Sequence, residues 1–185
     1  MIGYAFCGSF CTAAESMRIL ALLSANTDLR PIVSANFASI DTRFGRAADL
    51  VAKIEEICGK KAVRTVAEAE PLGPSEPLDA LIIAPCTGNT LAKLAHGITD
   101  GPVTMAAKAH LRADRPLLIA LASNDAMSAN LENIARLSLR KNVCFVPMKQ
   151  DDPIKKPYSL VADFSLIPEA LNAAFQGRQL RPLFL

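Results

Sequence analysis

Short, continuously apolar runs alternate along the chain with stretches of helical periodicity. The apolar runs are Ile2–Phe6, Pro31–Val33, Leu81–Ala84, Leu117–Leu121 and Val143–Val146. Between and after them, apolar residues recur at the i, i+3, i+4, i+7 spacing of a helix with one buried face. The clearest sets are Phe44, Ala47, Ala48 and Val51; Leu91, Leu94, Ala95 and Ile98; and Ile167, Ala170, Leu171 and Ala174. Apolar runs that do not alternate with polar residues are typical of parallel strands covered on both faces. The pattern predicts an α/β fold: one doubly wound, Rossmann-like (flavodoxin-like) parallel sheet with helices on both faces.

Length and composition favour one domain over residues 1–185. The chain is 51% hydrophobic, which suffices for one substantial core and is little for two. We interpret the proline-bearing segments "AEAEPLGPSEPLD" and "KQDDPIKKPYS" as surface loops, too short to be interdomain linkers. The net charge is only +2, with Lys and Arg scattered, so no nucleic-acid partner is predicted. No apolar run approaches the roughly 20 residues that span a bilayer, and the first residues lack a charged signal-peptide region. We therefore expect a cytoplasmic protein without a membrane partner.

The cysteines and histidines are too few and too scattered to predict a disulfide framework or a metal site. The chain has five cysteines, none in a CxxC pair, and two histidines. We interpret Cys7, Cys58 and Cys144 as small buried hydrophobic residues in a reducing compartment. His110, in "AAKAHLRADR", is interpreted as a solvated helix residue.

The segments that follow the first two strands carry small and hydroxyl-bearing residues. In a parallel sheet, ligands bind where the carboxyl ends of the strands meet. Gly8, Ser9 and Thr12 follow the first strand and begin a helix, whose free N–H groups suit a phosphate. The alternative is that Ser9 only caps that helix. There is no G-x-G-x-x-G motif, and the second strand ends at Ser34 and Asn36 rather than at an acidic residue. A mononucleotide therefore fits better than a dinucleotide.

The third and fourth strands end in similar polar segments. Pro85 cannot donate a ladder hydrogen bond, so we expect it to help end the third strand. The five small residues Cys86–Thr90 then expose backbone and hydroxyl groups, which suits a flat ring system. After the fourth strand, Ser123 and Asn124 border the same edge, although Ser123, Asn124 or Asp125 can instead cap the next helix.

In their order and spacing these motifs resemble the flavoprotein superfamily of FMN-binding cysteine decarboxylases and flavin prenyltransferases. "PCTGNT" stands where the decarboxylases carry a Pro-Ala-Ser-Ala-Asn-Thr loop, and "CTGNTLAKLAHGITDG" is similar to a flavin prenyltransferase stretch. "ASNDAM" looks like a degenerate form of the decarboxylase motif Pro-x-Met-Asn-x-x-Met-Trp, with Asn124 and Met127 matching. "GSFCT", "DTRFG", "KKPYSLVAD" and "RQLRPLF" extend the likeness over nearly the whole chain, to a branch that supplies one subunit of dipicolinate-forming oxidoreductases.

The resemblance implies an FMN-binding protein that assembles into trimers or larger homo-oligomers, with the flavin near a subunit interface. It implies phosphate contacts from Gly8, Ser9 and Thr12, with Ser34 or Ser39 as a further contact. It places the ribityl chain and the flavin ring on Cys86, Thr87, Gly88, Asn89 and Thr90, bordered by Ser123 and Asn124. It also implies an oxidoreductase that is active with a dehydrogenase-like partner subunit. That enzyme would form dipicolinate from a dihydrodipicolinate-type precursor during sporulation.

Departures from the family pattern argue against two other activities. The decarboxylases use a histidine after the second strand, whereas "ANFASIDTRFGRAADL" contains none. Ser128 stands in place of the tryptophan of the decarboxylase motif, and Ala122 stands at about the position of the prenyltransferase arginine. A stand-alone FMN-dependent decarboxylase or prenyltransferase is thus an alternative, as is a non-catalytic partner module with a vestigial flavin site.

Arg43, in "DTRFG", is the first of two candidate catalytic residues. With Asp41 or Thr42 capping the next helix, Arg43 would stand near the strand ends and bind a carboxylate in bidentate fashion. Dipicolinate and its precursor are dicarboxylates, so we expect Arg43, with Lys155 or Lys156, to recognise one carboxylate. The alternative is an exposed arginine paired with Asp41 or Asp49.

His96 is the second candidate, for general acid–base chemistry. Its alternative is a structural role, bonding a neighbouring loop or subunit.

For Cys86 the choice is between a small residue beside the ring and a catalytic thiolate, which needs a lowered pKa and access to solvent or substrate. The loop Asp151–Ser159 is predicted to close over the site.

Overall fold

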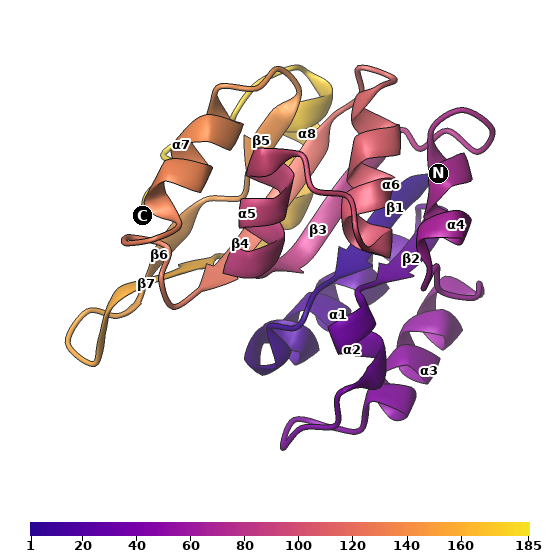
Figure 1. Cartoon of the computed structure of the whole chain (residues 1–185), viewed down its shortest axis with the longest axis horizontal. Coiled ribbons are helices and arrows are strands. Elements are labelled where there is room, and N and C mark those ends of the chain that lie inside the picture. Colours follow the sequence, from indigo (N-terminus) through magenta and orange to yellow (C-terminus); the bar gives the residue numbers. More distant parts are fainter.

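Seven strands form one mixed sheet in the computed structural model, which describes residues 1–185 (Figure 1). Five of them run parallel in the order β2-β1-β3-β4-β5, with the bounds β1 (Ile2–Phe6), β2 (Leu29–Val33), β3 (Ala80–Cys86), β4 (Leu117–Ser123) and β5 (Val143–Phe145). The other two, β6 (Met148–Asp152) and β7 (Lys156–Ala162), form an antiparallel hairpin. The hairpin pairs with the last two residues of β4, Ala122 and Ser123. The parallel part has the flavodoxin-like strand order, whose ligands bind where that order reverses, here between β1 and β3.

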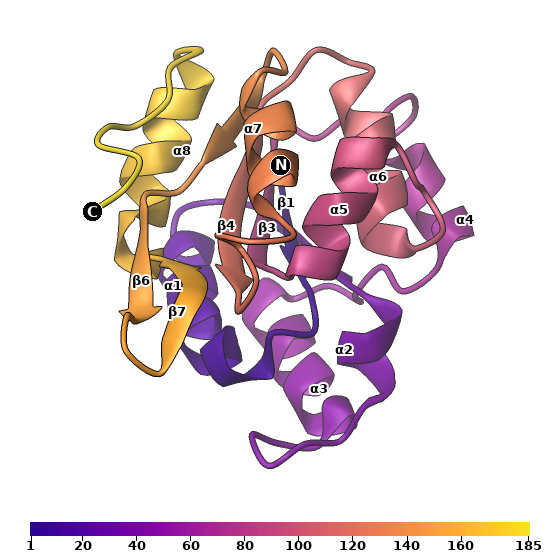
Figure 2. The same cartoon turned by 60° about the vertical axis from the view of Figure 1, so that its left-hand side comes forward.

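Helices cover both faces of the sheet, as Figure 2 shows from the side. One face carries α1 (Ala13–Ser24), α2 (Ala35–Ser39), α3 (Ala47–Cys58) and α8 (Ile167–Phe175). The other carries α4 (Val66–Ala69), α5 (Gly88–His96), α6 (Pro102–Leu111) and α7 (Leu131–Ser138). Short 3-10 turns at Phe10–Thr12, Glu70–Leu72 and Phe164–Leu166 complete the elements. The predicted doubly wound α/β fold is confirmed. None of the helices is long and apolar enough to cross a membrane.

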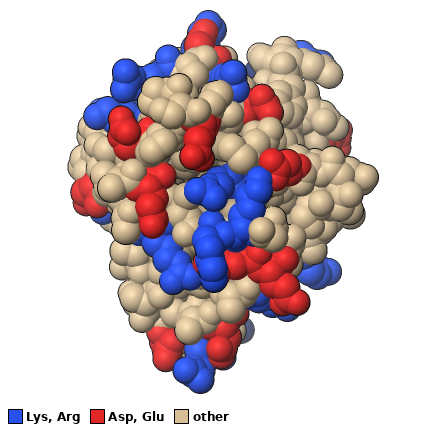
Figure 3. All heavy atoms as spheres, turned by 90° about the vertical axis from the view of Figure 1, so that its right-hand side faces the viewer, with Lys and Arg blue, Asp and Glu red and all other residues tan.

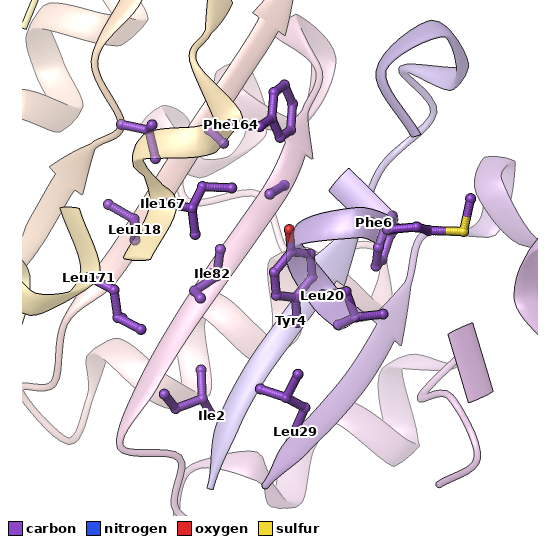
Figure 4. Close-up of a cluster of buried hydrophobic side chains, with 14 of the residues drawn as sticks. Ile2, Tyr4, Phe6, Leu20, Leu29, Ile82, Leu118, Phe164, Ile167 and Leu171 are labelled. Atoms are coloured by element: carbon purple, nitrogen blue, oxygen red, sulfur yellow. The ribbon is translucent and has the colours of Figure 1, made fainter. Parts of the chain in front are cut away.

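Alternation along the strands divides the core into two layers. Ile2, Tyr4 and Phe6 of β1 point to the face covered by α1 and α8, where Figure 4 shows them near Leu20 and Ile167. The intervening residues of β1 point to the opposite face. Each layer contains 25 buried hydrophobic residues. Both faces of the strands are therefore desolvated, as continuously apolar runs require.

A buried hydrogen-bond chain fixes α1 against the end of β3. The hydroxyls of Tyr4 and Ser16 lie 2.9 Å apart, and Ser16 Oγ donates to the carbonyl oxygen of Ala84 over 2.6 Å. All three residues are fully buried, so an unmade bond here would leave a desolvated polar group. These hydrogen bonds fix the position of α1, which follows β1, relative to the end of β3.

Four local expectations were wrong. The segment "AEAEPLGPSEPLD" is not only a surface loop, since it contains most of α4 and a 3-10 turn, with Ala69 and Leu72 buried. β3 does not end at Pro85 but continues to Cys86, with a shift of register against β4 between Ile83 and Cys86. Phe44 and Ile98 lie outside α3 and α5 and are 45% and 48% exposed, so each helical set is shorter than predicted. The segment "KQDDPIKKPYS" is the β6–β7 hairpin rather than a loop. Its polar outer residues hide the strand pattern, because only the inner ends of the hairpin are buried.

Glu55 ties the end of α3 to the connection that leads to α4. Its carboxylate accepts from Lys61 Nζ and Arg64 Nη2, each over 2.8 Å, and from the Ala62 N–H over 3.1 Å. The hydrogen bond from Lys61, with those from Ala62 and Arg64, lowers the pKa of Glu55 from its ordinary 4.5 to about 2. Figure 3 views the side of the molecule where α3 and α4 lie, and it shows Lys and Arg gathered among Asp and Glu. Charges there are largely compensated.

We expect Glu55→Gln to destabilise the protein at neutral pH. A carboxyl whose pKa is lower in the folded state stabilises that state above its unfolded pKa and loses the effect as pH falls towards the folded value. The loss at pH 7 should be about 1–2 kcal/mol, since Lys61 is solvent-exposed and screened. The variant should also lose part of the decline in stability between about pH 5 and pH 2. Urea unfolding across that range measures both. The exposed neighbour Glu56, as Glu56→Gln, should leave the curve unchanged.

Candidate functional site

The carboxyl ends of β1 to β4 meet at one edge of the sheet and bring together two adjoining hollows. We call the first the narrow hollow, with a volume of about 240 Å³. The second, the wide hollow, has a volume of about 770 Å³. Gly8, Thr87 and Asn89 line both. These residues follow β1 and β3, so the hollows join where the strand order reverses.

The narrow hollow is polar and lies between α2, α5 and the start of α6. Ser34 and Asn36 line it from the end of β2, and Lys93 lines it from α5. Lys93 Nζ donates to both carboxylate oxygens of Asp100, over 3.0 and 2.8 Å. Ser34 Oγ accepts from the Phe37 N–H over 3.2 Å and caps α2, so its position is fixed.

The first turn of α5 presents free backbone donors to both hollows. Thr87 caps the helix, because its Oγ1 accepts from the Thr90 N–H over 3.2 Å. Thr90 Oγ1 in turn donates to Cys7 Sγ over 3.3 Å, which binds α5 to the end of β1. The N–H groups of Gly88 and Asn89, at the positive end of the helix dipole, are left for a ligand.

Gly88 is needed because polar side chains pack directly on it. A Cβ at this position would lie 2.6 Å from Asn130 Nδ2, 2.8 Å from Asp125 Oδ1 and even closer to Ser123 Oγ. Ser123 Oγ donates to the Asp125 carboxylate. The Asp125 carbonyl oxygen accepts from the N–H groups of Ser128 and Asn130, each over 3.1 Å. The loop after β4 is thus held rigidly against the first turn of α5.

The wide hollow combines the strand ends with two outer segments. Phe10 and Cys11 line it from the turn after β1, and Asn124 and Asp125 line it from the loop after β4. Thr42 and Gly45 exchange backbone hydrogen bonds of 3.1 Å, closing a tight turn with Arg43 and Phe44 at its tip. Lys156 of the hairpin also lines this hollow. The segment Asp151–Ser159, which was predicted to close over the site, therefore contributes the side chain of Lys156 to it.

Nine of the twelve predicted cofactor residues line a hollow: Gly8, Ser9, Ser34, Thr87, Gly88, Asn89, Thr90, Ser123 and Asn124. The other three do not. Thr12 Oγ1 donates to Ser9 O over 3.0 Å, and Ser39 Oγ donates to Ala35 O over 2.8 Å. Cys86 is fully buried. Since their polar groups are used internally or shielded, we leave these three out of the candidate site. Ser9 makes no capping bond, so the cap alternative was wrong.

We call the segment Thr87–Asn89 at the start of α5 the platform. Neither cysteine near it is suited to act as a thiolate. Burial raises the pKa of Cys7 to about 11 and raises that of Cys86 well above its ordinary range. Cys86 Sγ lies 3.6 Å from the carbonyl oxygen of Thr87. Cys86 is therefore a small residue packed under the platform, not a nucleophile.

The two histidines lie away from the hollows. His96 is at the far end of α5 from the strand ends, where its Nδ1 accepts from Arg136 Nη1 over 3.2 Å. His96 thus lies outside the candidate site, and its bond to Arg136 fits the structural alternative. His110 is buried, not solvated, and its Nε2 donates to the carbonyl oxygen of Pro116 over 2.9 Å. Burial lowers the pKa of His110, which keeps the ring neutral.

Sequence reasoning missed several residues of the site. Asn36, Lys93 and Asp100 line the narrow hollow, and Phe10 and Asp125 line the wide one. One signal existed: Gly-Pro after Asp100 marks the start of a helix. That this start faces the end of β2 follows only from the packing of α6 beside α5 and β2.

Comparison with known proteins gives matches along the whole chain. The flavoprotein family model matches residues 4–165. The chain is 44% identical over 185 residues to the B subunit of dipicolinate synthase from Bacillus subtilis (strain 168), covering 100% of this chain and 92% of that protein. The crystal structure of the B subunit of dipicolinate synthase from Bacillus halodurans C superposes with a TM-score of 0.91 at 39% identity, covering 100% of this chain and 95% of the other. That of the FMN-dependent cysteine decarboxylase SpaF gives a TM-score of 0.68 at 27% identity, covering 94% and 95%.

Proposed function

The chain belongs to the flavoprotein family, and from this premise we propose that it binds FMN along the edge where β1 to β4 end. The observation that carries the proposal is the junction of a narrow polar hollow with a wide one at Gly8, Thr87 and Asn89. FMN has a matching shape, with a phosphate and ribityl chain on a broad ring. Ser34, Asn36 and Gly8 would hold the phosphate end, and Thr87–Asn89 would support the ring.

The residues of the site fit this cofactor chemically. The free N–H groups of Gly88 and Asn89 lie at the positive end of α5, where they favour an electron-rich or anionic group. Ser9 and Ser123 add hydroxyls beside them. Bound FMN would supply electron-transfer chemistry at its ring. The protein's part is to fix the cofactor between rigid strand ends and to leave one side open to a substrate.

We further propose that the chain acts as the B subunit of dipicolinate synthase, an oxidoreductase that forms dipicolinate from a dihydrodipicolinate-type precursor during sporulation. The support is the 44% identity along the whole chain to a protein of that name. A protein named as one subunit implies a partner, which we take to be a dehydrogenase-like A subunit. Met127 (40% exposed), Leu131 (49%) and Tyr158 (57%) project from segments adjoining the wide hollow. These exposed apolar side chains support contact with the A subunit or with further copies of this chain.

A stand-alone FMN-dependent decarboxylase is the second candidate, favoured by the likeness to SpaF. Against it, neither histidine lines the site. A partner module with a vestigial flavin site is disfavoured by the free donors and by the glycines that keep the hollows open.

Reconstitution with the A subunit tests the proposed activity. We expect dipicolinate formation only when both subunits and FMN are present, and we expect FMN-stripped chain to regain activity when FMN is restored. Dipicolinate is measured chromatographically in reactions that each omit one component. Full turnover by the A subunit alone, or equal turnover with FMN-stripped chain, would refute the proposed role.

A further inference from the structure

The wide hollow is lined by two cations and one carboxylate that come from three separate connections. Arg43 comes from the turn before α3, Lys156 from the hairpin and Asp125 from the loop after β4. Asp125 is the only acidic residue among the side chains that line this hollow. Positive charge therefore prevails on the outer segments, and the negative charge lies beside Gly88 on the platform.

Arg43 has no acidic partner, which excludes both pairings considered as its alternative. Asp41 Oδ1 accepts from the Ala47 N–H over 2.8 Å and caps α3. Asp49 pairs instead with Arg46, over 3.9 Å. The Arg43 guanidinium carbon lies 4.8 Å from the centre of the Phe44 ring. The ring supports one face of the guanidinium, so the N–H groups around its edge stay free for an acceptor.

Lys156, and not Lys155, completes the cationic side. Lys156 Nζ is bonded to Asp151, and this hydrogen bond raises the pKa of Lys156, so it is charged at neutral pH. An ammonium group has three donors, so two are left beyond that bond. Lys155 does not line the hollow. Sequence analysis named either Lys155 or Lys156 as a carboxylate contact, and only Lys156 is placed to serve as one.

We propose that the wide hollow binds a small dicarboxylate beside the flavin ring, with one carboxylate held by Arg43 and Lys156. Asp125 repels a carboxylate from the platform side, so it orients the substrate with its charged group outward. The proposal rests on the proposed FMN site and the proposed dipicolinate-forming activity, and it adds the residues that hold and orient the substrate. A charge-assisted bidentate pair with an arginine is among the stronger polar contacts in proteins.

Equilibrium dialysis against pyridine-2,6-dicarboxylate in chelator-treated buffer tests the proposal. It is run on the chain with and without FMN, and bound FMN is measured in the same samples. We expect Arg43→Met to weaken dicarboxylate binding by about tenfold or more, and Lys156→Met by a smaller factor. Asp125→Asn should strengthen it severalfold. The matched controls Arg46→Met and Lys155→Met should leave it unchanged.

Each result bears on one proposal. Dicarboxylate affinity that stays within twofold in Arg43→Met overturns the carboxylate site, even if FMN is retained. Equal losses in Arg43→Met and Arg46→Met overturn it as well, since they would reflect only overall charge. Failure of the wild-type chain to retain FMN contradicts the proposed function. In that case dialysis without FMN still decides whether Arg43 binds the dicarboxylate.

Discussion

Gly8→Val is expected to abolish FMN retention while the chain stays folded. Gly8 lines both hollows at their junction. A Cβ there would meet nothing nearer than 3.6 Å, from Asn36 Cβ and the Phe10 ring. Because Asn36 lines one hollow and Phe10 the other, the added side chain would fill the junction itself. A clash of about 1–3 kcal/mol corresponds to roughly a 5- to 150-fold loss of affinity.

Fluorescence titration with FMN measures this loss, and thermal unfolding of the same samples reports the fold. Gly8→Ala should show a smaller loss than Gly8→Val, since it adds only the Cβ. Ala52→Val, at an exposed position of α3, is the control for added apolar volume. Unchanged FMN affinity in Gly8→Val would show that the cofactor does not pass this junction.

Phe37→Ala should both destabilise the protein and weaken FMN binding. Phe37 is fully buried, and its ring centre lies 5.3 Å from that of Phe6 and 5.8 Å from that of Phe10. It is the one buried residue of the five-residue α2. A helix this short has no stability of its own, so Phe37 holds in place the segment that carries Ser34 and Asn36. Removing a buried phenylalanine costs about 3–5 kcal/mol.

Phe164→Ala is the matched control, because Phe164 is equally buried in the same core layer but lies in the 3-10 turn before α8 rather than in α2. Both variants should lose similar stability in urea unfolding. Only Phe37→Ala should lower FMN affinity, measured under conditions where both are folded. Equal losses of FMN affinity would mean that binding follows overall stability rather than the position of α2.

Much of the fold was predictable because its signals are local. The parallel strands are continuously apolar, and Ile167, Ala170, Leu171 and Ala174 of α8 are all buried as their spacing predicts. The hairpin was missed, since its exposed part reads "KQDD" and "KPY" and lacks an apolar pattern. The burial of His110 was missed because it depends on the chain around Pro116 and not on the sequence of its own helix.

The residues that line the hollows were predictable where strand ends alone determine their position. Gly8, Ser34, Thr87 and Asn124 follow parallel strands and must share an edge of the sheet. Thr12 and Ser39 lie outside the hollows because each hydroxyl bonds within its own turn, which residue type does not reveal. The choice between Lys155 and Lys156 depends on the pairing of a hairpin that the sequence did not predict.

The most direct test of the account is the absorption spectrum of the purified chain after addition of FMN and gel filtration, with the released cofactor identified by mass. The account predicts a yellow protein that retains one FMN per chain, and a colourless Gly8→Val variant that elutes at the same volume. A folded wild-type chain that emerges without flavin would contradict the claim that the strand-end hollows form a complete FMN site.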